Sequence, residues 1–240
     1  MRTYLLVVLA LLLAACNAPP KEPPPPVIDA TPERIVAQFE AVAFGQGNTR
    51  VTKWTQPNIR FAAALPARGA GAELNEQLPA HRQTITNITR IEFAPAGAGS
   101  DAEMRLIVAI RRQFRQIIAG WLPGDPGAAI LGATQSCTSI TAAGEDGRMT
   151  FAGILVGSDI SDGARRHCAL EEMVQAMGLP GNACVYRPSL FCDEDRVVEL
   201  AGADAMLLRV LYDPRLKPGM AREDAMARAR TIVTELWQGS

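Results

Sequence analysis

The sequence of 240 residues is poor in histidine, because it contains only His81 and His167. A metal centre built from three imidazoles is therefore excluded, since each imidazole ligand needs its own histidine. Aromatic residues are also few. We expect the three tryptophans to lie in the core or at the rim of a groove, in preference to a cofactor site: Trp54, Trp121 and Trp237.

Several sequence signals for common functions are missing. The formal net charge is −1 and no basic cluster stands out, so we expect no nucleic-acid partner. There is no G-x-S-x-G motif, and although Ser158, Ser161 and Asp159 lie near His167, no nucleophile elbow marks a serine hydrolase. No phosphate-binding loop is visible, and residues 144–147 (Gly-Glu-Asp-Gly) predict a hairpin turn.

One apolar run without charge, Tyr4 to Ala15, follows Arg2 at the N-terminus. It is too short for a stable transmembrane helix and is typical of a signal-peptide core. The run ends in Leu-Ala-Ala-Cys16, which resembles the bacterial lipobox, whose cysteine is acylated after cleavage. We therefore expect a signal peptide over 1–15 and a lipid anchor at Cys16. The alternative is an ordinary secretory signal with a chance cysteine.

Residues 16–29 are rich in proline, which favours polyproline II and cannot build a core. At about 3.1 Å per residue, this linker would hold the following domain roughly 35–40 Å from the anchor. Asn17 after the cysteine indicates the outer membrane, by resemblance to enterobacterial lipoproteins. We expect a bacterial envelope protein that faces the periplasm, attached to the membrane through its lipid.

Four cysteines remain after Cys16, and an exported protein with this number is expected to form two disulfides. Of the three possible pairings we favour Cys137–Cys168 and Cys184–Cys192. The competing interpretation is a Cys/His metal site, because His167 precedes Cys168. Adjacent helical residues point about 100° apart, which argues against a shared ion.

Residues 30–240 are expected to form a single domain. Thr31-Pro32-Glu33 is a typical helix start. The spacing of apolar residues predicts helices over 32–44, 74–88, 114–121, 163–177, 200–212 and 222–237, with Pro79 expected to break or kink the second. Alternation and apolar runs predict strands within 50–63, 91–93, 104–110 and 149–156. This order of elements predicts an α+β fold.

The stretch from Glu171 to Pro180, Glu-Glu-Met-Val-Gln-Ala-Met-Gly-Leu-Pro, is similar to the metzincin and matrixin helix H-E-x-x-H-A-L-G-L-x-H. In that pattern Glu171, Gln175 and Gly181 stand at the ligand positions, Glu172 stands at the general base, and Gly178 is the turn residue. A second signature agrees with the first, since matrixins carry a like helix after the active site: Leu-Ala-Gly-Ala-Asp204 with Leu-Tyr212. The resemblance implies a zincin-like mixed sheet with a motif helix and C-terminal helices.

A closer resemblance covers most of the mature chain. The runs 168–180, 187–191 and 207–220 resemble the bacterial domain-of-unknown-function 2927 family, whose members are often lipoproteins of proteobacteria with no established activity. This resemblance implies that Glu171 and Gln175 belong to a family pattern.

Metalloprotease chemistry needs three ligands and a base. Gly181 has no side chain and the Gln175 amide is a poor zinc ligand, so Glu172 is only a candidate catalytic residue. We therefore expect a non-catalytic zincin-like domain, without metal or cofactor, that binds an envelope peptide, protein or glycan. Glu171, Glu172 and Gln175 would be hydrogen-bond partners on the cleft floor, and strand 149–156 would be the edge.

Two alternatives remain open. The first is a metal-dependent hydrolase with Zn²⁺ or Ca²⁺ and Glu172 as base. Its support is that His167 and Glu171 lie four residues apart on one helix face, and that the acidic run 193–195 could add oxygen ligands. The second is a purely structural envelope lipoprotein, in which the acids cap the helix or pair with Arg165, Arg166 or Arg187.

Overall fold

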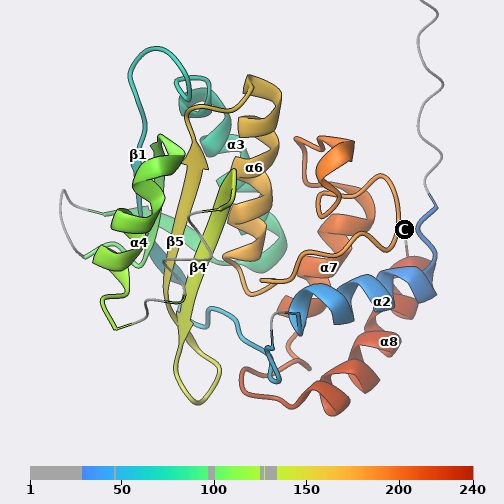
Figure 1. Cartoon of the computed structure of the whole chain (residues 1–240). Coiled ribbons are helices and arrows are strands. Elements are labelled where there is room, and N and C mark those ends of the chain that lie inside the picture. Colours follow the sequence, from blue (N-terminus) through green and yellow to red (C-terminus); the bar gives the residue numbers. More distant parts are fainter. Residues whose placement is uncertain (1–28, 46, 97–100, 125–126, 128–133, 240) are drawn as a thin grey trace, which may run out of the picture.

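The structure is a computed structural model that describes residues 29–45, 47–96, 101–124, 127 and 134–239 (Figure 1). The predicted signal peptide, Cys16 and the linker up to residue 28 lie outside these ranges. Among the described helices, none combines the length and the apolar character needed to cross a membrane.

The strands form one mixed sheet of five in the order β2-β1-β3-β5-β4. Neighbouring strands are parallel, except that β4 runs antiparallel to β5. In the described part of the chain, β2 and β4 therefore form the two edges. The strands are β1 (Asn58–Ala64), β2 (Glu92–Pro95), β3 (Met104–Ala109), β4 (Cys137–Ala143) and β5 (Met149–Gly157).

Strand β5 confirms the predicted apolar strand but not its predicted place. Its residues 152–157 are all buried, as expected for a strand covered on both faces. Strand β3 pairs along one side of it and β4 along the other. The prediction that this strand forms the sheet edge is therefore wrong, because β4, which the sequence analysis did not identify, lies outside it.

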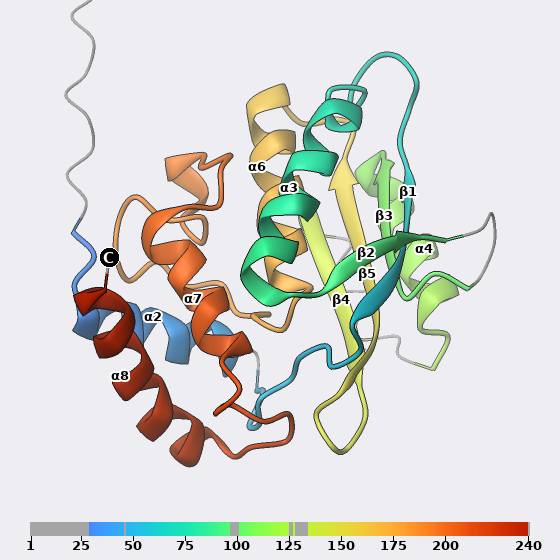
Figure 2. The ribbon, with the colours of Figure 1, turned by 180° about the vertical axis from the view of Figure 1, so that it is seen from behind.

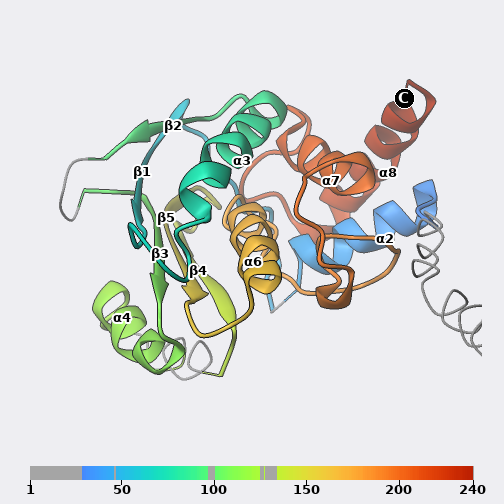
Figure 3. The same ribbon diagram turned by 90° about the horizontal axis from the view of Figure 1, so that it is seen from above.

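Two helices cover one face of the sheet and one short helix covers the other (Figure 3). The pair α3 (Leu74–Thr89) and α6 (Asp162–Gln175) lies on the first face, where α6 contacts β4 and β5. On the second face, the 3₁₀ turn η1 (Arg111–Gln113) leads into α4 (Phe114–Trp121). Phe114 and Ile118 of α4 pack with Leu155 of β5.

A second helical layer lies on the far side of α3 and α6 from the sheet (Figures 2 and 3). Helix α7 contacts α3, and α2 and α8 pack on each other and on α7. One hydrophobic core is continuous through both layers. The helices are α2 (Pro32–Ala43), α7 (Gly202–Tyr212) and α8 (Arg222–Gln238), with the 3₁₀ turn η2 (Asp193–Asp195) in the loop before α7.

Local sequence explains the helix starts. Thr31 Oγ1 accepts a hydrogen bond from the Arg34 N–H over 3.3 Å, which confirms the predicted cap of α2. Ser161 Oγ caps α6 in the same way through the Ala164 N–H. The prediction for Pro79 was a break or a kink in the helix, and the break is wrong, because α3 continues through this residue. Leu78 and Ile85 are buried on either side of the proline, and their packing offsets the one backbone hydrogen bond that proline cannot donate.

Both predicted disulfides are present. Cys137–Cys168 joins the first residue of β4 to α6, with a Cα–Cα distance of 5.9 Å. Cys184–Cys192 closes a short loop that follows α6. The predicted α+β class is confirmed by the mixed sheet and its helices.

Candidate functional site

Helix α6 places the predicted site residues beneath the edge strand β4, which it contacts directly. The side chains of Glu171, Glu172 and Gln175 are buried, with exposed fractions of 3%, 5% and 4%. Buried polar groups need hydrogen-bond partners within the protein. The partners of these three residues therefore determine what the site can do.

The Gln175 amide is fully engaged. Its Oε1 accepts a hydrogen bond from Ser139 Oγ of β4 over 3.1 Å. Its Nε2 donates to Glu171 Oε1 over 3.3 Å and to Asn182 Oδ1 over 2.5 Å. Ser139 and Asn182 were not identified from the sequence. The Thr/Ser/Ile alternation of 137–143 before the predicted hairpin turn is the signal that could have found Ser139.

The turn after α6 follows the motif pattern, but the third ligand position is closed. Gly178 has φ 114°, and a Cβ there would lie 2.1 Å from Thr52 O, so only glycine fits. The chain then returns toward α2, where the Gly181 N–H donates to Val42 O over 2.8 Å. A Cβ at Gly181 would lie 2.4 Å from Ala41 O. The residues at the zincin ligand positions thus do not fit a zincin-type metal ion.

The second sequence signature supports the end of α6. The Tyr212 hydroxyl donates to Met177 O over 2.9 Å and accepts from the Trp54 N–H over 3.3 Å. The Trp54 indole donates to Ala176 O over 2.8 Å. Trp54 is buried, as expected for a core tryptophan. These contacts satisfy carbonyl groups that a helix end leaves free.

Asp204, the acid of the second signature, organises the loop before α7. It accepts three hydrogen bonds of 2.7 Å, from the Tyr186 hydroxyl, the Ser189 hydroxyl and the Leu190 N–H. Burial raises the pKa of Asp204, and these hydrogen bonds act against the rise. The signature therefore has a structural explanation.

His167 is buried one turn before Glu171 on α6, with 1% of its surface exposed. Its Nδ1 lies 2.8 Å from Val197 O. Its Nε2 lies 3.4 Å from Glu171 Oε2 and 4.0 Å from Asp193 Oδ1. Burial lowers the pKa of His167, but the Glu171 carboxylate and the Val197 carbonyl outweigh this effect and raise it.

Two of the three arginines considered as partners for the α6 acids, Arg165 and Arg187, have other partners, and in the described part of the chain no ion pair joins Arg166 to these acids. Arg165, which is 2% exposed, pairs with Glu73 over 2.8 Å and with Asp162. Arg187 pairs with Glu194 and with Asp195. In the described part of the chain, the ion pairs of Glu171 and Asp193 are with His167 alone.

Glu172 combines burial with like charge. Burial and the neighbouring Glu171 raise the pKa of Glu172 to about 8, and hydrogen bonds from Ser139 act against the rise. Its Oε2 has no hydrogen-bond partner among the described residues. Such a carboxyl can exchange a proton near neutral pH, which is the property of a general base, but a base also needs access to a substrate.

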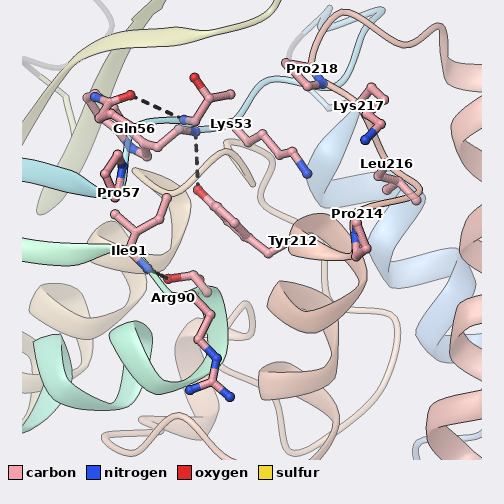
Figure 4. Close-up of a pocket in the computed structure, with 13 residues that line it drawn as sticks. Lys53, Gln56, Pro57, Arg90, Ile91, Tyr212, Pro214, Leu216, Lys217 and Pro218 are labelled. Atoms are coloured by element: carbon pink, nitrogen blue, oxygen red, sulfur yellow. Dashed lines mark hydrogen bonds between the residues drawn. The ribbon is translucent and has the colours of Figure 1, made fainter.

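A separate surface pocket of about 350 Å³ lies between the segment 53–57, the end of α3 and the segment after α7 (Figure 4). Burial and the nearby Lys217 lower the pKa of Lys53 there to about 8. The Lys53 ammonium group donates to Leu211 O over 2.9 Å and lies 5.4 Å from the Tyr212 ring centroid. Lys53 therefore serves as a cap for the end of α7.

Comparison with models of protein families gives a match over most of the chain. The model of the family described as "Protein of unknown function (DUF2927)" matches residues 32–231. No curated protein and no solved structure matches the chain. The matched range contains the sheet, the motif helix α6 and both sequence signatures, and it covers most of the chain. The protein therefore belongs to the DUF2927 family.

Proposed function

We propose that the protein is a periplasm-facing envelope protein, held at the outer membrane by a lipid anchor, whose zincin-like domain binds an extended peptide segment without cleaving it. The proposal rests on two features: the lipobox-like N-terminus, which predicts the anchor, and the edge strand β4, which offers a binding site for a peptide. Two disulfides support an oxidising compartment such as the periplasm. The observation that carries the binding proposal is the position of β4 beside the motif helix.

Strand β4 offers one side to a ligand. It is the last strand in the sheet order and pairs only with β5 among the described strands. An edge strand presents a row of backbone N–H and C=O groups, to which an extended peptide can add as a further strand. This main-chain chemistry favours a peptide segment of an envelope protein over a glycan.

Strand β4 is also held rigidly, which favours binding. Cys137 is bonded to Cys168 of α6, and Ser139 contacts Gln175 of the same helix. The alternation of a strand therefore directs Cys137, Ser139 and Thr141 to α6. A fixed edge loses little conformational freedom when a ligand binds.

Peptide cleavage has less support than binding. Gln175 is engaged by three neighbours, and the backbone of α2 closes the position of Gly181. Glu172 consequently has no metal-bound water to activate at the positions of the motif.

Photo-crosslinking in cells tests the binding proposal. A photoreactive residue at Thr138 or Ala142 of β4 should give discrete adducts with an envelope protein, and one at Glu92 of the opposite edge strand β2 should give none. Equal labelling from both edges, or no adduct from β4, would contradict the proposal. Peptide hydrolysis by the purified protein that disappears in Glu172→Gln would replace it with the metal-dependent hydrolase.

A further inference from the structure

Three potential ligand atoms converge on one side of α6, in a set that includes Glu171 but neither of the other two zincin ligand positions, Gln175 and Gly181. They are His167 Nε2 and a carboxylate oxygen from each of Glu171 and Asp193, and all lie within 4.8 Å of one another. His167 and Glu171 come from successive turns of α6. Asp193 comes from η2, which directly follows the disulfide-bonded Cys192.

The orientation of His167 directs a lone pair at the two carboxylates. Its Nδ1 lies 2.8 Å from Val197 O, and a carbonyl oxygen can only accept a hydrogen bond. The ring proton of the neutral imidazole therefore lies on Nδ1, and Nε2 carries the lone pair. Among the described residues Nε2 has no hydrogen-bond partner, although the side chain is only 1% exposed.

This arrangement is the one that metal-binding histidines adopt. Such histidines donate their second ring N–H to a backbone carbonyl or carboxylate, which fixes the tautomer and aims the other nitrogen at the metal. Val197 supplies that carbonyl from the same loop that carries Asp193. The loop thus fixes Nδ1 through the Val197 carbonyl and places the Asp193 carboxylate 4.0 Å from Nε2.

The surrounding charge also favours a cation. Glu171 is buried beside His167, and the carboxylate of the exposed Asp193 lies 4.0 Å from His167 Nε2. Buried carboxylates are costly without a compensating positive charge, and a single imidazole supplies at most one.

We propose that His167 Nε2, Glu171 and Asp193 bind one zinc ion. Zinc with bonds of about 2.0–2.2 Å to nitrogen and oxygen separates its tetrahedral ligands by roughly 3.3–3.6 Å. The observed separation from Nε2 to Glu171 Oε2 is 3.4 Å, and that to Asp193 Oδ1 is 4.0 Å. Asp193 is 81% exposed, so its side chain is free to close the difference.

The imidazole ligand favours zinc over calcium and magnesium. Calcium and magnesium prefer oxygen ligands only, whereas zinc combines histidine and carboxylate readily. Bound zinc would join α6 to the loop of η2, and its fourth position would be open to solvent or to a partner. This inference goes beyond the proposed function, because it does not depend on a peptide at β4.

Zinc binding is tested on the full-length protein in detergent after removal of metals with a chelator. Titration calorimetry with Zn²⁺ should give one ion per chain, and the melting temperature should rise with zinc concentration. Asp193→Asn should weaken binding at least about tenfold, which is the scale of effect seen when a metal site is perturbed. Because Asp193 is exposed, this variant should fold normally.

Two control variants test whether zinc binding depends on these three residues, and not on exposed acidic residues in general or on the other histidine. Glu194→Gln alters an equally exposed neighbour, at 77% exposure, that pairs with Arg187, and it should bind zinc as the parent does. His81→Gln removes the only other histidine of the sequence and should also retain the site. His167→Gln should abolish the visible bands that Co²⁺ gives in a site of this kind.

Three results would overturn the proposal. The first is an absence of any zinc-dependent rise in melting temperature, which is the expectation if a protonated His167 simply pairs with Glu171. The second is equal zinc affinity in the parent and in Asp193→Asn. The third is equal stabilisation of the protein by Ca²⁺ or Mg²⁺, which would show that the imidazole is not a metal ligand.

Discussion

The two buried acids Asp204 and Glu172 show how differently this fold treats a carboxyl group. Both oxygens of Asp204 accept hydrogen bonds, from two hydroxyl groups and one backbone N–H. Glu172, by contrast, has one oxygen without a partner in the described structure. Satisfied buried acids stabilise a fold, whereas unsatisfied ones cost stability and are retained where they serve a function.

We expect Asp204→Ala to lower the free energy of unfolding by about 3–5 kcal/mol, because it strands three buried donors that each cost ~1–3 kcal/mol when unpaired. Urea denaturation followed by circular dichroism measures the loss. Asp146→Ala is the control, since Asp146 is 61% exposed and its pair with Arg148 is worth little. Similar losses in the two variants would contradict this interpretation of Asp204.

The buried His81 should make stability depend on pH. Burial lowers its pKa, although Glu199 acts against this, so the folded protein favours the neutral ring. As the pH falls below about 6.5, the unfolded chain binds the proton more readily and stability is lost. Urea denaturation from pH 7.5 to 5.5 should show the parent losing stability relative to His81→Gln. A difference between the two that does not vary with pH would be the contrary outcome.

At the scale of elements, α6 is the connection between the sheet and the helical layer. Its start is fixed by Ser161 and by the Arg165–Glu73 pair to α3, and its end by Trp54 and Tyr212. Its side is bonded to β4 through Cys168. Elements held at both ends and along one side are the rigid supports on which sites are built.

The two disulfides should contribute unequally. They span 31 and 8 residues of sequence, and closing a longer loop removes more entropy from the unfolded chain. The chain-entropy estimate is about 3.7 kcal/mol for the first and about 2.5 kcal/mol for the second. Cys137→Ala with Cys168→Ala should therefore lower the urea midpoint more than Cys184→Ala with Cys192→Ala. A reversed order would show that native-state contacts, and not loop length, dominate.

Helices were the elements best predicted from the sequence. Helix α2 could be predicted from its own residues, because its signals are local. They are the cap at Thr31 and the helical spacing of Ile35, Phe39 and Val42. Strand β4 was missed because its side chains are only half-buried and its pattern is weak without its partner. Because β4 was missed, the predicted strand β5 was placed at the edge of the sheet. The order of strands depends on contacts between residues distant in sequence, which local patterns do not reveal.

The candidate site was predictable in part. Glu171, Glu172 and Gln175 were found through a helical motif, and His167 and Asp193 were considered as ligands through their spacing and charge. Ser139 has only the weak alternation of 137–143 as a signal, and Asn182 and the Val197 carbonyl have none, because they reach α6 only through the fold. The backbone closure at Gly181 could not be predicted, since it depends on how α2 packs.

At the scale of the whole molecule, the described residues begin at the end of α2 that faces away from the sheet (Figure 1). The proposed anchor at Cys16 precedes this point in the chain, so it would connect to the domain on the side away from the sheet and β4. The proposed binding edge and the proposed attachment point are therefore compatible with each other.

The anchor proposal predicts a change of cell fraction. Cys16→Ser should move the protein from the membrane fraction to the soluble fraction and abolish labelling by a fatty-acid analogue, because the thiol is the acylation site. Asn17→Asp is the matched control, since it leaves the cysteine intact and should keep the protein attached. Fractionation and immunoblotting measure both, and retention of Cys16→Ser at the membrane would reject the lipid anchor.

The close approach at Gly181 constrains the evolutionary future of this scaffold. Any side chain there would collide with the backbone of α2, whose Val42 carbonyl already binds the Gly181 N–H. Laboratory evolution that places histidines at 171 and 175 would still lack a third imidazole, because a histidine side chain at 181 would collide with this backbone. A three-histidine site at these positions would require the packing of α2 to change first.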